Sequence, residues 1–130
     1  MTYRSDNPDV TPDVLRERLE GTFPGDLGIE PLEITKERSQ GRLLVDQRHL
    51  HPGGYVHGGV WAAFADTVAA WGTWRNLTAG SDFTTIEMKL NVFAAGRPGA
   101  DDARRPPIAP GHALHSPPTA RYRCPPGMFP

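Results

Sequence analysis

The hydrophobic residues of the chain follow two different periods in its middle part. After Gly59 the segment VWAAFADTVAAWGTWRNL is apolar almost all round, which predicts a helix from about Gly58 to Leu77. Such a helix is normally enclosed by its own protein or by a neighbouring subunit. From Thr85 to Phe93 apolar and polar side chains alternate, which predicts a half-buried strand. The apolar face of this strand comprises Ile86, Met88, Leu90 and Val92.

The first third of the chain predicts a short helix and a β-hairpin. Thr11-Pro12-Asp13 combines an N-cap, a first-turn proline and an acidic residue, so an amphipathic helix begins here and ends before Gly21. A first strand lies within 27–38, with an irregularity at Pro31. Ser39-Gln40-Gly41 has the composition of a turn, and a second strand follows over 42–48.

The character of the sequence changes after Arg97. Nine of the fourteen prolines fall in 98–130, and no alternation of four or more residues survives there. We therefore expect a domain over 1–97 and a disordered Pro/Arg-rich tail over 98–130. Three strands and one long helix leave the sheet short and its edges exposed, although proteins ordinarily cover or pair such edges.

Length and charge favour one small soluble domain. The chain has 130 residues and a net charge of −1, so nothing indicates a surface for nucleic acid. The single cysteine, Cys124, excludes an intrachain disulfide and fits the cytoplasm. The N-terminal residues lack an apolar signal core, and no run approaches the roughly 20 apolar residues of a membrane span.

The segment HPGGYVHGGVWAAFAD, residues 51–66, carries the candidate chemistry. A helix that begins at Gly58 presents backbone N–H groups without intrahelical partners, which suits a developing oxyanion. Asp66 is the only ionisable side chain between Gly58 and Trp74, and would act as acid, base or nucleophile. The spacing of His49, His51 and His57 matches no metal-ligand pattern, so we expect no metal site.

These residues carry a resemblance to a known family. HPGGYVHGGVWAAFADT followed by TTIEMKLNVF resembles the phenylacetate-pathway (PaaI-like) branch of the hotdog-fold acyl-CoA thioesterases, over roughly 27–95. The resemblance implies an α+β hotdog fold, in which an antiparallel sheet wraps a long central helix. It also implies paired protomers with each active site between them, and two or more further strands after Ala95. The chain departs from that pattern, because GADDARRPPIAPGHALHSPP resembles a GC-rich gene read in a shifted frame.

The resemblance implies a role for four residues. Asp66 would be the nucleophile on the thioester carbonyl or the base on a water molecule, and the Gly58 N–H would be the oxyanion donor. His51 falls where relatives often carry an amide side chain, and Thr85 matches a position that holds the attacking water in some relatives. We further expect three residues to contact substrate: His57, Gly59 and Trp61. Each position also has a simpler interpretation as a structural acid, a turn glycine, a capping histidine, a strand threonine or a core tryptophan.

The sequence therefore predicts a thioesterase that cleaves an aryl- or medium-chain acyl-CoA to the free acid and CoA. No metal or organic cofactor is expected, and the expected assembly is a homodimer or homotetramer without nucleic-acid or membrane partners. Hotdog hydratases fit less well, because they carry a catalytic histidine further along the helix and none follows Asp66 there. The alternative is a non-catalytic acyl-thioester binding module, or a defective, truncated thioesterase.

Overall fold

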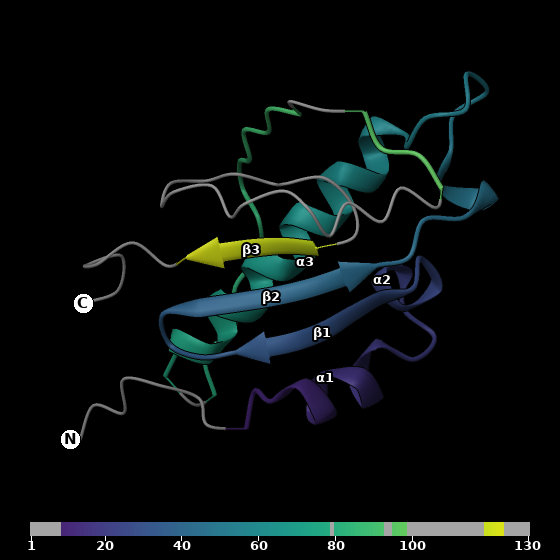
Figure 1. Cartoon of the computed structure of the whole chain (residues 1–130). Coiled ribbons are helices and arrows are strands. Elements are labelled where there is room, and N and C mark those ends of the chain that lie inside the picture. The colour runs from purple at the N-terminus through teal and green to yellow at the C-terminus, as the bar shows by residue number, and fades with distance from the viewer. Residues whose placement is uncertain (1–8, 79, 93–94, 99–118, 124–130) are drawn as a thin grey trace.

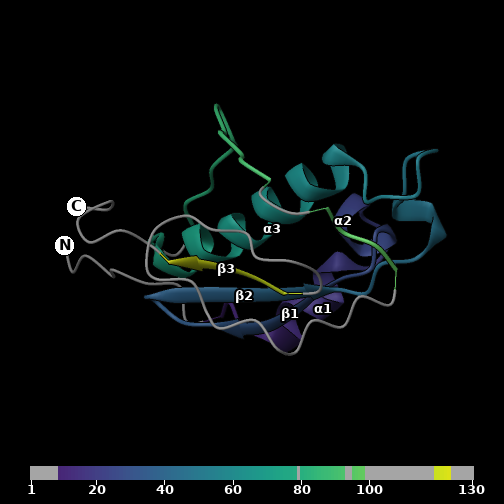
Figure 2. The ribbon, with the colours of Figure 1, turned by 45° about the horizontal axis from the view of Figure 1, so that its top comes forward.

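The computed structural model describes residues 9–78, 80–92, 95–98 and 119–123. Three strands form one antiparallel sheet in the order β1-β2-β3, and the long helix α3 lies across one face of it (Figures 1 and 2). The helix α1 packs beside β1, on the side away from β2 (Figure 1). The elements are α1 (Pro12–Leu19), α2 (Phe23–Asp26), β1 (Ile29–Ile34), β2 (Arg38–Leu43), the 3-10 turn η1 (Gln47–His49), α3 (Gly58–Asn76) and β3 (Thr119–Arg123).

Helix α1 confirms the prediction made from its N-terminal signals. The Thr11 side chain accepts a hydrogen bond of 3.3 Å from the backbone N–H of Val14, as an N-cap does. Leu15 is buried, so the helix turns its apolar side to the core. The single-turn helix α2 was not predicted, although Thr22 and Pro24 are typical of a helix start.

The hairpin of β1 and β2 turns earlier than predicted. Thr35 and Arg38 close the turn, because the Thr35 N–H donates to the Arg38 carbonyl at 2.7 Å. The predicted turn at 39–41 and the predicted strand over 42–48 are therefore wrong, since β2 is Arg38–Leu43. The irregularity at Pro31 is confirmed, because the register shifts between Pro31 and Glu33.

The turn-like residues Ser39 and Gly41 lie within β2 because helix α3 packs directly on them. The buried Ser39 hydroxyl donates a hydrogen bond of 2.6 Å to the carbonyl oxygen of Val68 in α3. A Cβ on Gly41 would lie 2.8 Å from Val68 Cγ2 and 3.0 Å from Trp71 Cζ3. The hydroxyl and the missing side chain therefore let the helix approach the sheet, and neither residue makes a turn.

Helix α3 confirms the longest predicted element and supplies much of the core. It runs from Gly58 to Asn76, and the Leu77 N–H closes it by donating to the carbonyls of Thr73 and Trp74. No helix in the described ranges is long and apolar enough to cross a membrane. The buried hydrophobic core comprises Val10, Leu15, Ile29, Leu43, Val56, Val60, Trp61, Phe64, Val68 and Trp71.

The strand predicted from Thr85 to Phe93 is not formed, because residues 81–92 have no strand pairing. Ile86 is 97% exposed, and Met88 and Val92 are also exposed. A segment of alternating apolar and polar residues forms a strand only where a neighbouring strand pairs with its backbone. β3 occupies the free edge of β2, and the segment instead runs beside α3 on the side away from β1 and β2 (Figures 1 and 2). Phe93 lies outside the described residues.

Residues 119–123 differ from the expectation of a disordered tail, because they form β3. This strand pairs antiparallel with β2, with Ser39 opposite Tyr122. The division into 1–97 and 98–130 stays a prediction, as does the shifted reading frame. Residues 99–118 and 124–130, which include Cys124, lie outside the described residues.

Candidate active site

A tight loop, residues 51–57, precedes α3. The His51 N–H donates to the Tyr55 carbonyl at 2.9 Å, and the Gly54 N–H donates to the His51 carbonyl at 2.9 Å. Gly54 has a φ of 84°, a left-handed conformation that favours glycine. The His57 N–H then donates to the His49 carbonyl at 2.9 Å. These backbone bonds fix the position at which the helix begins.

The first residue of α3, Gly58, presents a free backbone donor. The Gly59 N–H donates to Nδ1 of His57 at 2.8 Å, and the Val60 N–H donates to the His57 carbonyl at 2.9 Å. The Gly58 N–H meets no acceptor in the part of the chain that the structure describes. A Cβ on Gly58 would meet nothing within 4 Å, so there is open space beside this residue at the positive end of the helix.

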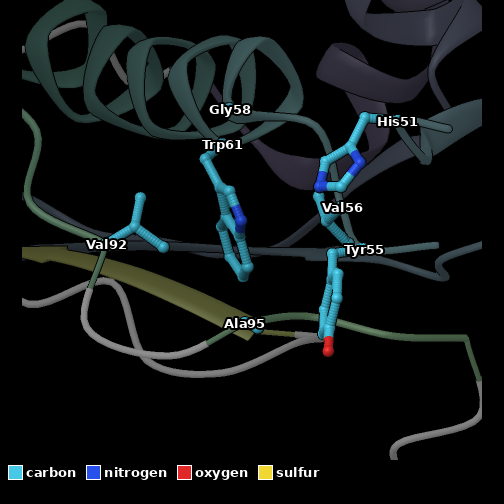
Figure 3. A pocket seen from close by; sticks show the side chains of 7 residues that line it. All are labelled: His51, Tyr55, Val56, Gly58, Trp61, Val92 and Ala95. Atoms are coloured by element: carbon cyan, nitrogen blue, oxygen red, sulfur yellow. The ribbon is translucent and has the colours of Figure 1, made fainter. Parts of the chain in front are cut away.

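An open pocket of about 550 Å³ lies beside this donor. Trp61 projects from the first turn of α3 toward Ala95, with the rings of His51 and Tyr55 on one side and Val92 on the other (Figure 3). This volume is within the usual range of small-molecule sites. The lining residues are His51, Tyr55, Val56, Gly58, Trp61, Val92 and Ala95. Three of the predicted site residues thus share one pocket.

The two histidines near the pocket both cap backbone groups. Nδ1 of His51 accepts a hydrogen bond of 2.9 Å from the Gly53 N–H, so the neutral ring carries its proton on Nε2. His51 lines the pocket and keeps Nε2–H as a donor. His57 is exposed and is absent from the pocket lining. Because His57 uses the Gly59 N–H as its capping partner, that N–H is already occupied and cannot also bind a ligand.

Asp66 meets another predicted residue, Thr85. The Thr85 hydroxyl donates a hydrogen bond of 2.7 Å to Oδ1 of Asp66. Asp66 is half-buried in α3, whereas Thr85 is exposed. Oδ2 of Asp66 accepts no hydrogen bond from the described residues. One carboxylate oxygen is therefore held and the other is available.

Within one chain, Asp66 and Gly58 do not lie in the same pocket. Asp66 follows Gly58 by two turns of α3, a rise of about 12 Å at 1.5 Å per residue. Asp66 is also absent from the residues that line the pocket. The structure therefore groups Gly58 with His51 and Trp61, and it groups Asp66 with Thr85.

The pair of Tyr55 and Arg97 was not predicted from the sequence. The Arg97 guanidinium carbon lies 4.3 Å from the centroid of the Tyr55 ring, and Arg97 also donates a hydrogen bond to the Tyr55 hydroxyl. The two residues are 42 positions apart, so no local pattern signals the contact. An aromatic residue in a glycine-rich loop beside the candidate oxyanion site was the available signal for Tyr55.

The third histidine of this region, His49, is structural. Its fully buried ring accepts a hydrogen bond of 2.9 Å from the Asp46 N–H at Nδ1, and Nε2 lies 2.7 Å from the Leu27 carbonyl oxygen. Nε2 therefore carries the proton and donates to that carbonyl. Across the described residues, no group of three or more His, Cys, Asp or Glu is placed to hold a metal ion.

The loop from Gly53 onward, the first turn of α3, Asp66 and Thr85 fall within one matched region. Residues 53–101 match the model of the thioesterase superfamily. A curated relative from Bacillus subtilis, provisionally named as the esterase ComA2, is 38% identical over 66 residues. That match covers 51% of this chain and 52% of the relative, so the chain spans about half the length of the curated relative it matches.

Solved thioesterase structures share the fold. A thioesterase from Haemophilus influenzae superposes with a TM-score of 0.65 at 24% identity, covering 76% of this chain and 67% of that one. A mutant thioesterase from Pseudomonas aeruginosa gives a TM-score of 0.52 at 19% identity, covering 57% of this chain and 53% of that one. The predicted fold class, an α+β hotdog fold, is confirmed by this similarity to the thioesterase superfamily.

Proposed function

We propose that this chain is the subunit of an acyl-CoA thioesterase of the PaaI-like branch, which hydrolyses an aryl- or medium-chain acyl-CoA. The free N–H of Gly58 at the start of α3, beside an open pocket, carries this proposal. The donor lies within the residues that match the thioesterase superfamily. Thioester hydrolysis places negative charge on the carbonyl oxygen, and a fixed backbone donor stabilises that charge without reorganisation.

Asp66 is the proposed reactive carboxylate, in one of two roles. As a nucleophile, its free oxygen bonds to the thioester carbon and expels CoA as the thiolate, and water then hydrolyses the resulting anhydride. As a general base, it takes a proton from a water molecule whose oxygen attacks the same carbon, and the C–S bond then breaks with CoA leaving as the thiolate. The Thr85 hydroxyl supports both roles, because it holds Oδ1 and leaves Oδ2 free.

Two copies of the chain are needed to complete the proposed site. A rise of about 12 Å separates Gly58 from Asp66 along α3, which is too far for both to act on one thioester carbonyl group. We therefore propose a homodimer, or a homotetramer built from such dimers, in which Gly58 of one protomer faces Asp66 of another. A symmetric dimer would contain two such sites.

The other pocket residues have supporting roles in this proposal. His51 lines the pocket, and its Nε2–H would donate to the carbonyl or to water, as an amide side chain does. Trp61 would form the apolar wall against the acyl group. His57 and Gly59 would act indirectly, by shaping the start of the helix. The proposed steps use water and the backbone and side-chain groups of the protein.

A second candidate is an acyl-thioester binding module or a defective thioesterase. The observation in its favour is the segment 81–92, which carries Thr85 but is not part of the described sheet. A site residue on an unpaired, exposed segment is less rigidly held than one on a strand. Such a chain would still bind thioesters in the pocket without turning them over.

Thiol release from a panel of acyl-CoA esters separates the two candidates. The proposed enzyme releases CoA, and Asp66→Asn lowers kcat by about 100-fold or more, as expected for loss of a general base or nucleophile. Equal background release by both proteins, with unchanged circular dichroism, would favour the binding module. Light scattering on the same samples measures the assembly, and a monomer that retains full activity would contradict the shared site.

A further inference from the structure

We propose that Arg97, held against Tyr55 beside the pocket, binds an anionic group of the thioester and thereby selects substrates by charge. This inference rests on the proposed thioesterase function and assigns a binding residue to the same site. The group is a carboxylate or a phosphate. It would come either from the phosphates of CoA or from a carboxylate at the far end of the acyl chain.

The backbone holds Arg97 in place beside the pocket. The Val56 N–H donates a hydrogen bond of 2.9 Å to the carbonyl of the buried Gly96, which precedes Arg97. Val56 and Ala95 both line the pocket (Figure 3). Tyr55 is itself fixed by its carbonyl bond to the His51 N–H. The contact between Tyr55 and Arg97 therefore joins two anchored segments at the pocket.

Arg97 carries a charge that no described carboxylate neutralises. Among the described residues, its guanidinium has no carboxylate partner and makes one hydrogen bond, to the Tyr55 hydroxyl. A guanidinium carries five N–H donors, so most of them remain available. Four other described arginines each pair with a carboxylate: Arg16, Arg38, Arg42 and Arg48. Arg97 differs from these four by facing an aromatic ring.

The surroundings of Arg97 favour an anion over a neutral group. None of the described residues that line the pocket is a carboxylate, and the start of α3 adds partial positive charge. Stacking on Tyr55 orients the planar guanidinium, which suits two-point binding of carboxylate or phosphate oxygens. The Gly58 N–H has a separate task at the reacting carbonyl. Arg97 therefore supplies a second positively charged group, away from the reacting carbonyl.

Three thioesters distinguish the two sources of the anion. Butyryl-CoA carries phosphates, butyryl-N-acetylcysteamine carries no charge, and glutaryl-N-acetylcysteamine carries only an acyl carboxylate. We compare the wild type with Arg97→Gln and Arg97→Lys. Arg18→Gln is the matched control, because it removes the same charge from an exposed position on α1. Circular dichroism checks that each variant is folded.

We expect Arg97→Gln to lower kcat/KM for one of the charged thioesters by about tenfold or more, mainly through KM, as for a lost charge-assisted bond. A lower kcat/KM for butyryl-CoA would show that Arg97 binds the phosphates of CoA. A lower kcat/KM for the glutaryl ester would show that it binds the acyl carboxylate. The uncharged ester and the Arg18→Gln control change by less than about twofold, and Arg97→Lys recovers part of the loss. No change, or an equal loss on all three esters, would overturn the inference.

Binding measurements test the role of Arg97 independently of the proposed activity. If the wild type hydrolyses none of the three esters, the proposed function fails, while calorimetric titration with CoA and with the glutaryl ester still tests Arg97. Weaker binding of either ligand by Arg97→Gln would support the anion site in a non-catalytic protein. Equal affinities of wild type and Arg97→Gln for both ligands would overturn it.

Discussion

The Thr85 hydroxyl donates a hydrogen bond of 2.7 Å to Oδ1 of Asp66, although 19 positions separate the two residues. The bond ties the exposed segment 81–92 to α3. It also restricts rotation of the carboxylate, which leaves Oδ2 as the free oxygen. A weakly packed segment and a proposed catalytic group therefore depend on each other.

Removing this bond should slow the reaction without unfolding the protein. We expect Thr85→Val, which keeps the shape of threonine, to lower kcat by about tenfold or more, because a hydrogen bond to a charged group is lost. Thr85→Ser keeps the hydroxyl and should retain most of the activity. Steady-state thiol release measures both variants, and equal rates for Val and Ser would show that the bond plays no part in turnover.

Gly58→Pro should remove the proposed oxyanion donor alone. Proline is tolerated at the first position of a helix, and His57, with ψ at 138°, has the extended conformation that a residue before proline adopts. We expect kcat/KM to fall by about 100-fold or more, the usual effect of losing one such donor. Gly58→Ala is the control, since it keeps the N–H and its Cβ meets nothing within 4 Å. Equal activity of the two variants would argue against the donor.

Mixed dimers test whether the site is shared. Asp66→Asn and Gly58→Pro are each expected to be inactive as pure proteins. In a mixed dimer one site combines both defects, and the other pairs an intact Asp66 with an intact Gly58. Unfolding and refolding the two variants together should restore about a quarter of wild-type activity, because half of the randomly formed symmetric dimers are mixed. No recovery, with mixed dimers verified by mass spectrometry, would place the site within one chain.

Gly41→Ala should weaken the contact between β2 and α3. The added Cβ would lie 2.8 Å from Val68 Cγ2 and 3.2 Å from the Glu30 carbonyl oxygen, so side chains or backbone must shift. We expect the free energy of unfolding to fall by about 1–3 kcal/mol, as in other overpacked cores. Urea unfolding followed by tryptophan fluorescence measures this, with Gly58→Ala as a glycine control in open space. An unchanged midpoint would contradict the tight contact.

The loop after α3 should be sensitive to acid through Asp82. A hydrogen bond from the Phe83 N–H, and to a lesser extent one from Trp74 Nε1–H, holds the pKa of Asp82 below its usual value. The folded state favours the ionised form of Asp82, so the carboxylate stabilises the folded protein at pH values above the ordinary carboxyl pKa. This stabilisation is lost as the pH falls through the pKa that Asp82 has in the folded state. Asp82→Asn should therefore lose less stability than the wild type below about pH 4. Identical pH dependence in urea unfolding would contradict this role.

The fold that could be predicted rests on local signals. Thr11 and Pro12 mark the start of α1, and the apolar run after Gly59 marks α3, because capping and side-chain periodicity act within a few residues. The hairpin could be predicted, but its turn could not. Ser39 and Gly41 have turn-like side chains, and their position in β2 depends on contacts with α3, some 30 residues away.

The candidate site divides in the same way. The sequence determined Gly58 at the first turn of an apolar helix and Asp66 two turns later, because both follow from the helix itself. Tertiary structure decided that Thr85 reaches Asp66, that Arg97 stacks on Tyr55, and that the alternating segment from Thr85 does not pair as a strand. The physical reason is that strand pairing and contacts between distant segments need a partner, and the period of one segment does not specify that partner.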